Sequence, residues 1–146
     1  MLQRIQTVFL LLAFAAFTML FLLPFATSDS EGTNLMADKV FNIQDHAILL
    51  SLCSAGALLA IVNIFKYNNR NTQVRLNYLL IVIAILLIVL SFVLFLQEGE
   101  EWLNTAQVDD QAGAYMPFSA ILFAALANYF IKKDEKKIRS AYDRLR

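Results

Sequence analysis

The sequence predicts an all-α membrane protein built as a bundle of four transmembrane helices. Three observations lead to this fold class: the composition, four long apolar runs and the distribution of charge. Of the 146 residues, 59% are hydrophobic and only 16% are charged, and the mean hydropathy is +0.58. A soluble domain of this length needs more polar surface to cover its core. Lipid is therefore the expected solvent for most of the chain.

The four apolar runs have about the length that a membrane crossing requires. A hydrocarbon core of about 30 Å takes roughly 20 helical residues. The expected spans are residues 5–25, 47–65, 76–96 and 114–131. They divide the chain into a four-helix transmembrane bundle, residues 1–131, and a tail, residues 132–146.

The ends and faces of these runs support helices. The first run closes at Leu23-Pro24, where a residue without an amide donor suits a helix end. It is longer than the usual core of a secretory signal, so we expect it to stay as a span. The third run is apolar on every face and is expected to present a bulky surface to lipid or to a partner. In the fourth run, Pro117 is expected in the first helical turn, where proline is tolerated.

The charges predict the orientation. Connections rich in Lys and Arg are retained in the cytoplasm. Eleven of the twelve basic residues lie before the first run, between the second and third, or after the fourth; Lys39 is the exception. The other two connections, residues 26–46 and 97–113, are acidic. Both termini are therefore expected in the cytoplasm, and the protein is expected to be a multi-pass membrane protein.

The tail is expected to continue the fourth helix as a basic amphipathic helix. Ile138, Tyr142 and Leu145 fall on one helical face. Such a segment can bind anionic lipid, an acidic protein surface or RNA phosphates. The basic residues expected to make cytoplasmic contacts are Lys66, Arg70, Arg75, Lys132, Lys133, Lys136, Lys137, Arg139, Arg144 and Arg146.

Small residues predict where helices approach one another. Close helix contacts in membranes favour small side chains, and amides can bond across them. On the second run these residues occur on two neighbouring rows, and on the fourth they recur every four residues up to an asparagine. The residues expected to pack helices are Ser51, Ala55, Gly56, Ala60, Ala120, Ala124 and Asn128.

The outer connections have simple interpretations. Trp102 is expected to anchor the chain at the headgroup level, where an indole has both an apolar and a polar environment. The acids of residues 97–113 match no calcium-loop spacing. Residues 35–43 could form a short interfacial helix.

Catalytic chemistry has little support. No ionisable residue lies inside a span, and no phosphate-binding loop, metal cluster or nucleophile with a base is found. Cys53 is the single cysteine. Asp45 and His46 are neighbours in the sequence, and their position at the start of a helix explains them better than a role in acid–base catalysis. We expect no cofactor, no metal and no enzymatic activity.

Three polar segments carry a family resemblance. They are MLQRIQTVFLLLA at residues 1–13, IFKYNNRNTQVRL at residues 64–76, and IKKDEKKIRSA at residues 131–141 with DRLR at residues 143–146. Together they resemble the four-helix membrane proteins of Bacteroidota grouped as domain of unknown function 4293. The resemblance covers the whole chain and implies a Gram-negative inner membrane, but it implies no functional residues.

Two functional classes follow. The first is a non-enzymatic accessory or scaffolding subunit of a larger membrane assembly, which would act in protein export or membrane-protein biogenesis. Its expected partners are the lipid bilayer, other membrane subunits, and anionic lipid or a ribosome at the tail. No DNA is expected. The alternative is a homo-oligomeric carrier or channel for a neutral or apolar solute. It needs a polar cavity lined by residues such as Asn63, Asn77 and Asn128, which lie near the cytoplasmic ends rather than at the midplane. A membrane enzyme ranks third.

Overall fold

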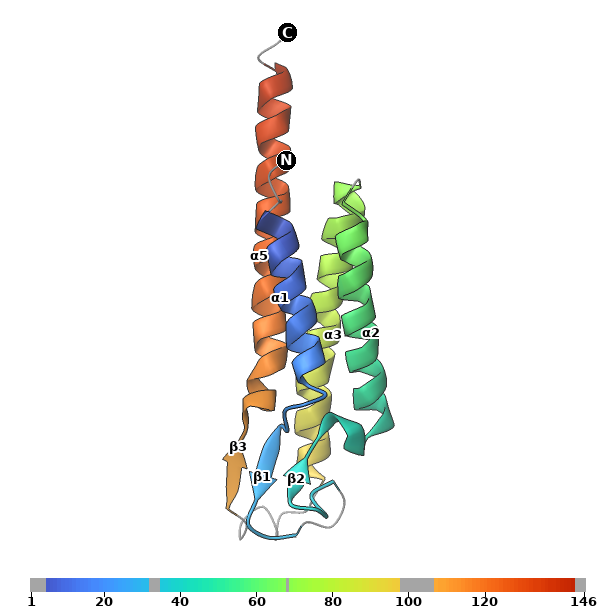
Figure 1. Cartoon of the computed structure of the whole chain (residues 1–146), viewed down its shortest axis with the longest axis vertical. Coiled ribbons are helices and arrows are strands. Elements are labelled where there is room, and N and C mark those ends of the chain that lie inside the picture. The colour runs from blue at the N-terminus through green and yellow to red at the C-terminus, as the bar shows by residue number, and fades with distance from the viewer. Residues whose placement is uncertain (1–4, 32–34, 68, 98–106, 144–146) are drawn as a thin grey trace.

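The computed structural model describes residues 5–31, 35–67, 69–97 and 107–143, with side chains as far as residue 136. Within these residues, four α-helices form an elongated bundle with a small sheet at one end (Figure 1). The helices are α1 (Ile5–Met19), α2 (Ala47–Phe65), α3 (Arg70–Leu96) and α5 (Ala112–Asp143). Both α1 and α3 pack against α2 and α5, so the helices form a ring in the order α1, α2, α3, α5. The prediction of four helices is confirmed.

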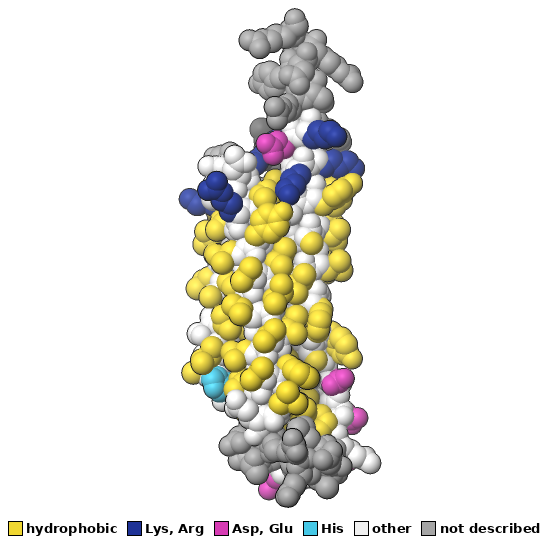
Figure 2. Space-filling view, turned by 180° about the vertical axis from the view of Figure 1, so that it is seen from behind, with side chains coloured by type: hydrophobic (Ala, Val, Ile, Leu, Met, Phe, Trp, Pro, Cys, Tyr) yellow, Lys and Arg dark blue, Asp and Glu magenta, His cyan; other side chains and the backbone are white. Residues whose placement is uncertain are grey.

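Three of these helices are long and apolar enough to cross a membrane: α2, α3 and the Ala112–Lys136 part of α5. The described part of α1 has 15 residues and is an apolar helix shorter than that length. Figure 2 shows apolar side chains covering the middle of the molecule, with Lys and Arg gathered near one end. The surface is thus divided along the bundle axis as a membrane requires.

The helix ends differ from the expected spans for local reasons. α1 ends at Met19, and the amides of Phe21, Leu22 and Leu23 continue into a turn by bonding back to Thr18 and Met19. Pro24 cannot extend that turn, because it has no amide hydrogen to donate. α3 begins at Arg70, six residues before the expected span 76–96, and the Asn69 side chain accepts a hydrogen bond from the amide of Thr72 at 3.3 Å.

The start of α5 corrects one expectation. The helix begins at Ala112, so Pro117 lies in its second turn rather than its first. A proline there removes the amide that would bond to the carbonyl of Gly113. The first turn is instead held by the amide of Gly113, which donates to the carbonyl of Pro24 at 3.0 Å.

A three-stranded antiparallel sheet, not predicted from the sequence, closes the end of the bundle opposite the chain termini (Figure 1). Its strands are β1 (Ala26–Ser28), β2 (Val40–Phe41) and β3 (Val108–Asp110), in the order β2-β1-β3. Ala26 pairs with Phe41 on one side and with Asp110 on the other. The sheet therefore ties the segment after α1 to the segments that precede α2 and α5.

The interfacial helix considered for residues 35–43 is wrong. That segment forms turns, strand β2 and the start of a 3₁₀ helix, Ile43–Asp45. Val40 and Phe41 have the β-branched and aromatic side chains that favour strands. Pairing with β1 satisfies their backbone groups, and Phe41 and Ile43 are buried.

Small residues of α2 let α1 approach closely. Gly56, Ala57 and Ala60 are buried on the side of α2 that faces the bundle. A Cβ added at Gly56 would lie 2.5 Å from the nearest ring carbon of Phe17, whose side chain is also buried. The position therefore admits no side chain unless the ring moves.

Replacing Gly56 by alanine should lower the free energy of unfolding by about 1 kcal/mol. Overpacking costs about 1–3 kcal/mol, and the better helix propensity of alanine returns about 1 kcal/mol. The measurement is unfolding of the detergent-solubilised protein by titration with sodium dodecyl sulfate. Ala55→Leu on the exposed side of α2 is the control and should change stability by less than about 0.5 kcal/mol. Equal effects of the two changes would contradict the packing described here.

Candidate functional site

Five polar residues are buried among the described side chains, and they gather near the end of the bundle that carries the termini. α1 contributes one, α2 one, α3 two and α5 one. They are Gln6, Asn63, Gln73, Asn77 and Asn128, and none is more than 6% exposed. We call this group the amide cluster. Burial of a carboxamide costs free energy unless it is hydrogen-bonded, so the partners of each decide what the cluster does.

A continuous set of hydrogen bonds joins three helices through the asparagines. Asn63 on α2 donates from Nδ2 to Oδ1 of Asn77 on α3, at 2.8 Å. Asn77 donates in turn from Nδ2 to Oδ1 of Asn128 on α5, at 3.0 Å. Asn77 is thus both donor and acceptor in this row, whereas Asn63 only donates and Asn128 only accepts.

The glutamines extend the cluster to α1 and to the backbone. Gln73 donates from Nε2 to the carbonyl of Asn63 at 3.1 Å, and Asn63 donates to the carbonyl of Gln73 at 3.3 Å. Gln6 donates from Nε2 to Oε1 of Gln73 at 3.5 Å, a long contact. All four helices therefore meet in one polar network.

One acceptor in the amide cluster is left without a protein partner. Oδ1 of Asn63 is buried and has no hydrogen bond. A single ordered water could satisfy it, since polar buried sites commonly hold one. The other fully buried side-chain N and O atoms of the cluster have hydrogen-bond partners, so the cluster acts as a lock between helices.

The carrier alternative would need Asn63, Asn77 and Asn128 to line a polar cavity. They bond to each other, and the cavity described below lies near the sheet and does not include them. Gln6 and Gln73 were not singled out from the sequence. The spacing Gln73, Asn77, Leu80, Ala84, Leu87 follows one face of α3, and all five are buried. That periodicity was the available signal.

The residues expected to pack helices divide into two groups. Gly56, Ala60, Ala120, Ala124 and Asn128 are buried. Ser51 and Ala55 are exposed, so they pack against no other helix within the described part of the chain. Small residues occur around much of α2, and the bulk of Phe17 on α1 selects the row through Gly56 as the inner one.

Basic side chains surround the amide-cluster end of the bundle (Figure 2). Lys66, Arg75, Lys132, Lys133 and Lys136 are exposed, and Arg70 is partly exposed. Lys132 donates to the hydroxyl of Tyr78 at 3.0 Å, and the ammonium of Lys133 lies 5.7 Å from the ring centre of Tyr129. The predicted contacts of Lys137, Arg139, Arg144 and Arg146 lie outside the described side chains, and Trp102 lies outside the described residues.

Asp45 and His46 serve the backbone separately. His46 caps α2 by accepting a hydrogen bond at Nδ1 from the amide of Ile48, at 3.3 Å. The Asp45 carboxylate accepts from the amide of Asn42. No pairing of Asp45 with His46 occurs among these contacts, and the explanation by a helix start is the one their geometry supports.

Burial raises the pKa of the Asp45 carboxyl above its ordinary value, with the charge of Asp38 acting in the same direction and the bond from Asn42 opposing it. A raised pKa means that the Asp45 carboxyl stays protonated to a higher pH in the folded chain than in the unfolded chain. Stability should therefore fall as the pH rises from about 3.9 through the raised pKa of the folded chain.

Asp45→Asn should remove this fall, because asparagine does not titrate. The measurement is the unfolding midpoint of the wild-type protein and the variant over that pH range. Asp29→Asn, at an exposed carboxyl of the same end, is the control and should keep it. A variant Asp45→Asn with the wild-type pH profile would contradict the assignment.

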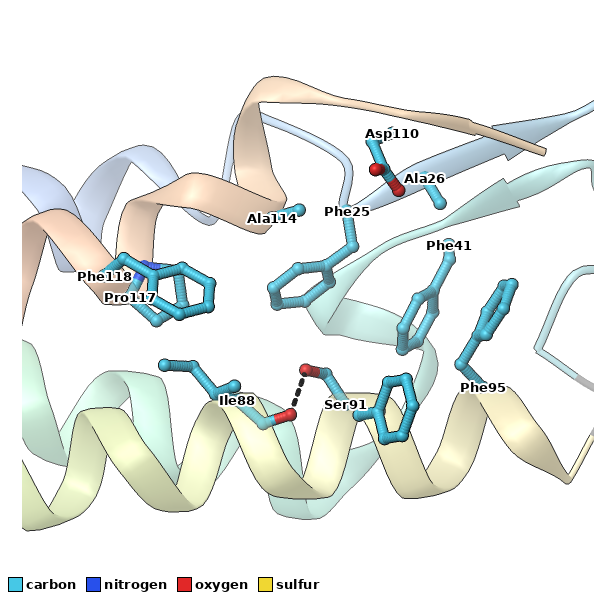
Figure 3. Close-up of a pocket in the computed structure, with 11 residues that line it drawn as sticks. Phe25, Ala26, Phe41, Ile88, Ser91, Phe95, Asp110, Ala114, Pro117 and Phe118 are labelled. Atoms are coloured by element: carbon cyan, nitrogen blue, oxygen red, sulfur yellow. Dashed lines mark hydrogen bonds between the residues drawn. The ribbon is translucent and has the colours of Figure 1, made fainter.

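A partly open cavity of about 260 Å³ lies at the sheet end, between α3, the first turns of α5 and the inner face of the sheet. Figure 3 shows the ring of Phe25 between the two helices, with Pro117 and Phe118 on one side and Phe41 on the other. Its remaining lining residues are Ala26, Ile88, Ser91, Phe92, Phe95, Asp110 and Ala114. The described lining is thus mostly aromatic and aliphatic, and Asp110 is the one charged residue in it.

Metal ligands do not gather in the part of the chain that the structure describes: no three His, Cys, Asp or Glu residues there could hold an ion together. Cys53 is buried in α2, and its thiol donates to the carbonyl of Phe17 at 3.0 Å.

The family model described as "Domain of unknown function (DUF4293)" matches residues 2–145. Searches of the curated proteins and of the solved structures found no match.

Proposed function

Because this chain belongs to the DUF4293 family over nearly its whole length, and that family carries no assigned activity, we propose a function from the structure: a non-enzymatic accessory or scaffolding subunit of a larger assembly in the bacterial inner membrane. In this proposal the apolar helices anchor the protein in the membrane, and the basic helix binds a partner.

The observation that carries this proposal is the length of α5. Its 32 residues extend about 48 Å, whereas a hydrocarbon core is about 30 Å thick. Figure 1 shows α5 continuing beyond α1, α2 and α3 at the end that carries the termini. Lys132, Lys133 and Lys136 are exposed where α5 approaches this extension, and Lys132 still contacts Tyr78 of α3. A helix that leaves its bundle with exposed cations can dock on an acidic protein surface, on RNA phosphates or on anionic lipid.

The amide cluster supports a scaffold rather than a carrier. A carrier for a neutral solute needs polar groups that are free to meet it near the midplane. Asn63, Asn77 and Asn128 instead bond to one another and hold three helices together. A bundle locked in this way is suited to presenting a fixed surface.

The proposed orientation places both termini and the α2–α3 connection in the cytoplasm. Its support is the separation of charge: Lys66, Arg75 and Lys133 are exposed at one end, and Asp109 and Asp110 are exposed at the other. A cysteine placed at Lys66 in a Cys53→Ser background should resist a membrane-impermeant maleimide in intact cells, and one placed at Asp109 should react. The opposite result would reverse the orientation.

The test of the proposed function is co-purification from the native membrane in a mild detergent. The full chain is compared with a chain ending at Ile131 and with a chain in which Lys132, Lys133 and Lys136 are replaced by glutamine. We expect a stoichiometric companion with the full chain and its loss from both variants. Components of protein export or of membrane-protein biogenesis are the class we expect.

Glutamine at Lys66, Arg70 and Arg75 provides a matched control, since it removes three charges from the same end but leaves α5 intact. This variant should retain the companion. A full chain that purifies alone, or as a homo-oligomer, would contradict the accessory role and favour the carrier alternative.

A further inference from the structure

The cavity at the sheet end has the lining of a site for an apolar chain. Phe25 and Phe41 come from the sheet region, Ile88 and Phe95 from α3, and Phe118 from α5. At about 260 Å³ it lies just below the roughly 300–1,000 Å³ of sites that enclose a whole drug-sized ligand. It therefore suits the insertion of part of a longer apolar molecule.

The position of the cavity indicates where such a molecule would come from. Phe92 on α3 and Phe118 on α5 line the cavity and are 63% and 56% exposed. Both belong to helices long and apolar enough to cross a membrane, so their exposed faces look into lipid. The apolar molecules available next to the cavity are therefore the acyl chains of the bilayer.

One charged residue gives the cavity a chemical preference. Asp110 on β3 pairs with Ala26 on β1, which pairs with Phe41 on β2. Residues opposite each other in an antiparallel sheet point to the same face. Ala26 and Phe41 are buried against the bundle, so the Asp110 side chain lies on that inner face. Figure 3 shows its carboxylate on the side of β3 nearest Ala26.

The Asp110 carboxylate stands at the edge of an apolar site, where an ionic contact is stronger than in open water. Among the described residues, no Lys or Arg forms an ion pair with it. An ammonium group is the complementary partner, and a lipid headgroup that bears one reaches this depth when its acyl chain enters the cavity.

We propose that this cavity binds a lipid whose headgroup carries an ammonium group, with part of one acyl chain among Phe25, Ile88 and Phe118 and the ammonium on the Asp110 carboxylate. This site is independent of the basic helix of the proposed function, since it lies at the opposite end of the bundle. Its failure and the failure of the accessory role are therefore separable.

The test is native mass spectrometry of the full chain in detergent with phosphatidylethanolamine or phosphatidylglycerol of identical acyl chains. Phosphatidylglycerol lacks the ammonium group. We expect the wild-type protein to bind the first phosphatidylethanolamine about tenfold more tightly than the first phosphatidylglycerol, a difference typical of one charge-assisted contact.

Two variants separate the headgroup contact from the acyl-chain contact. Asp110→Asn should abolish the preference and leave the binding of phosphatidylglycerol intact. Ser91→Leu fills the cavity and should weaken the binding of both lipids about tenfold or more. Asp110 is exposed, so Asp110→Asn should leave the fold intact. The headgroup contact can therefore be tested even if Ser91→Leu disturbs the fold.

Each variant has a matched control. Asp109→Asn changes the preceding carboxylate of β3, which does not line the cavity. Ser51→Leu changes an exposed serine of α2 whose hydroxyl, like that of Ser91, bonds to the carbonyl three residues earlier. Both controls should bind lipid as the wild-type protein does. Equal affinities for the two lipids, equal results for Asp110→Asn and Asp109→Asn, or a second protein chain bound in place of lipid would overturn the proposal.

Discussion

Replacing Asn77 by leucine should lower the free energy of unfolding by about 2 kcal/mol, because Asn77 is the central member of the amide cluster. Its loss leaves Oδ1 of Asn128 without its bond and removes one of the two acceptors of the Asn63 amide. A buried polar group deprived of its partner costs more than the bond itself contributes. The measurement is unfolding by titration with sodium dodecyl sulfate in mixed micelles.

Asn71→Leu is the matched control, since Asn71 is an exposed asparagine of the same helix. It should change stability by less than about 0.5 kcal/mol. In the double variant Asn77→Leu with Asn128→Leu, both partners are apolar, and part of the lost stability should return. If Asn77→Leu and Asn71→Leu unfold at the same detergent fraction, the amide cluster does not hold the helices together.

Gly113→Ala should destabilise the protein by about 3 kcal/mol, the upper part of the range for overpacking. A Cβ at this position would collide with the backbone of Leu23 and Pro24, including the carbonyl oxygen of Pro24 that accepts the Gly113 amide. A backbone segment cannot turn aside as a flexible side chain does. The first turn of α5 would have to move away from the segment that joins α1 to β1.

The control for Gly113→Ala is Ala112→Ser at the exposed neighbouring position, which should be nearly neutral. The same detergent titration measures both variants. Because Ala114 and Pro117 line the cavity, Gly113→Ala should also weaken lipid binding there. A variant as stable as the wild-type protein would show that α5 does not start against Pro24.

The four helices could be predicted because an apolar run of about 20 residues has few alternatives. α2, for example, runs over Ala47–Phe65, the range that its apolar run suggested. The sheet could not be predicted. Its strands have two or three residues each, too few for an alternating pattern, and β3 lies far from β1 in the sequence.

The candidate sites were predictable only in part. Asn128 could be recognised as an amide able to bond across helices, but its partner Asn77 depends on how α3 and α5 face each other. Gln6 and Gln73 lie near the ends of apolar runs. A glutamine at such a position can equally well be exposed to water, so the sequence did not mark these two as buried. The placement of Asp110 beside an apolar cavity follows from the register of β1 with β3, which no local pattern encodes.

The sheet also orders the events by which the chain folds. Its two pairings differ greatly in sequence separation: β1 meets β2 after one short connection, whereas the side-chain bond from Gln111 to Thr27 closes a separation of 84 residues. Contacts between distant segments form slowly, because the chain between them must first lose its freedom. The β1–β2 hairpin can form as soon as the first two helices are inserted, but β3 exists only after the third helix has crossed the membrane. Completion of the sheet therefore has to wait for the third helix, and a nascent chain stalled before residue 107 carries an open edge on β1.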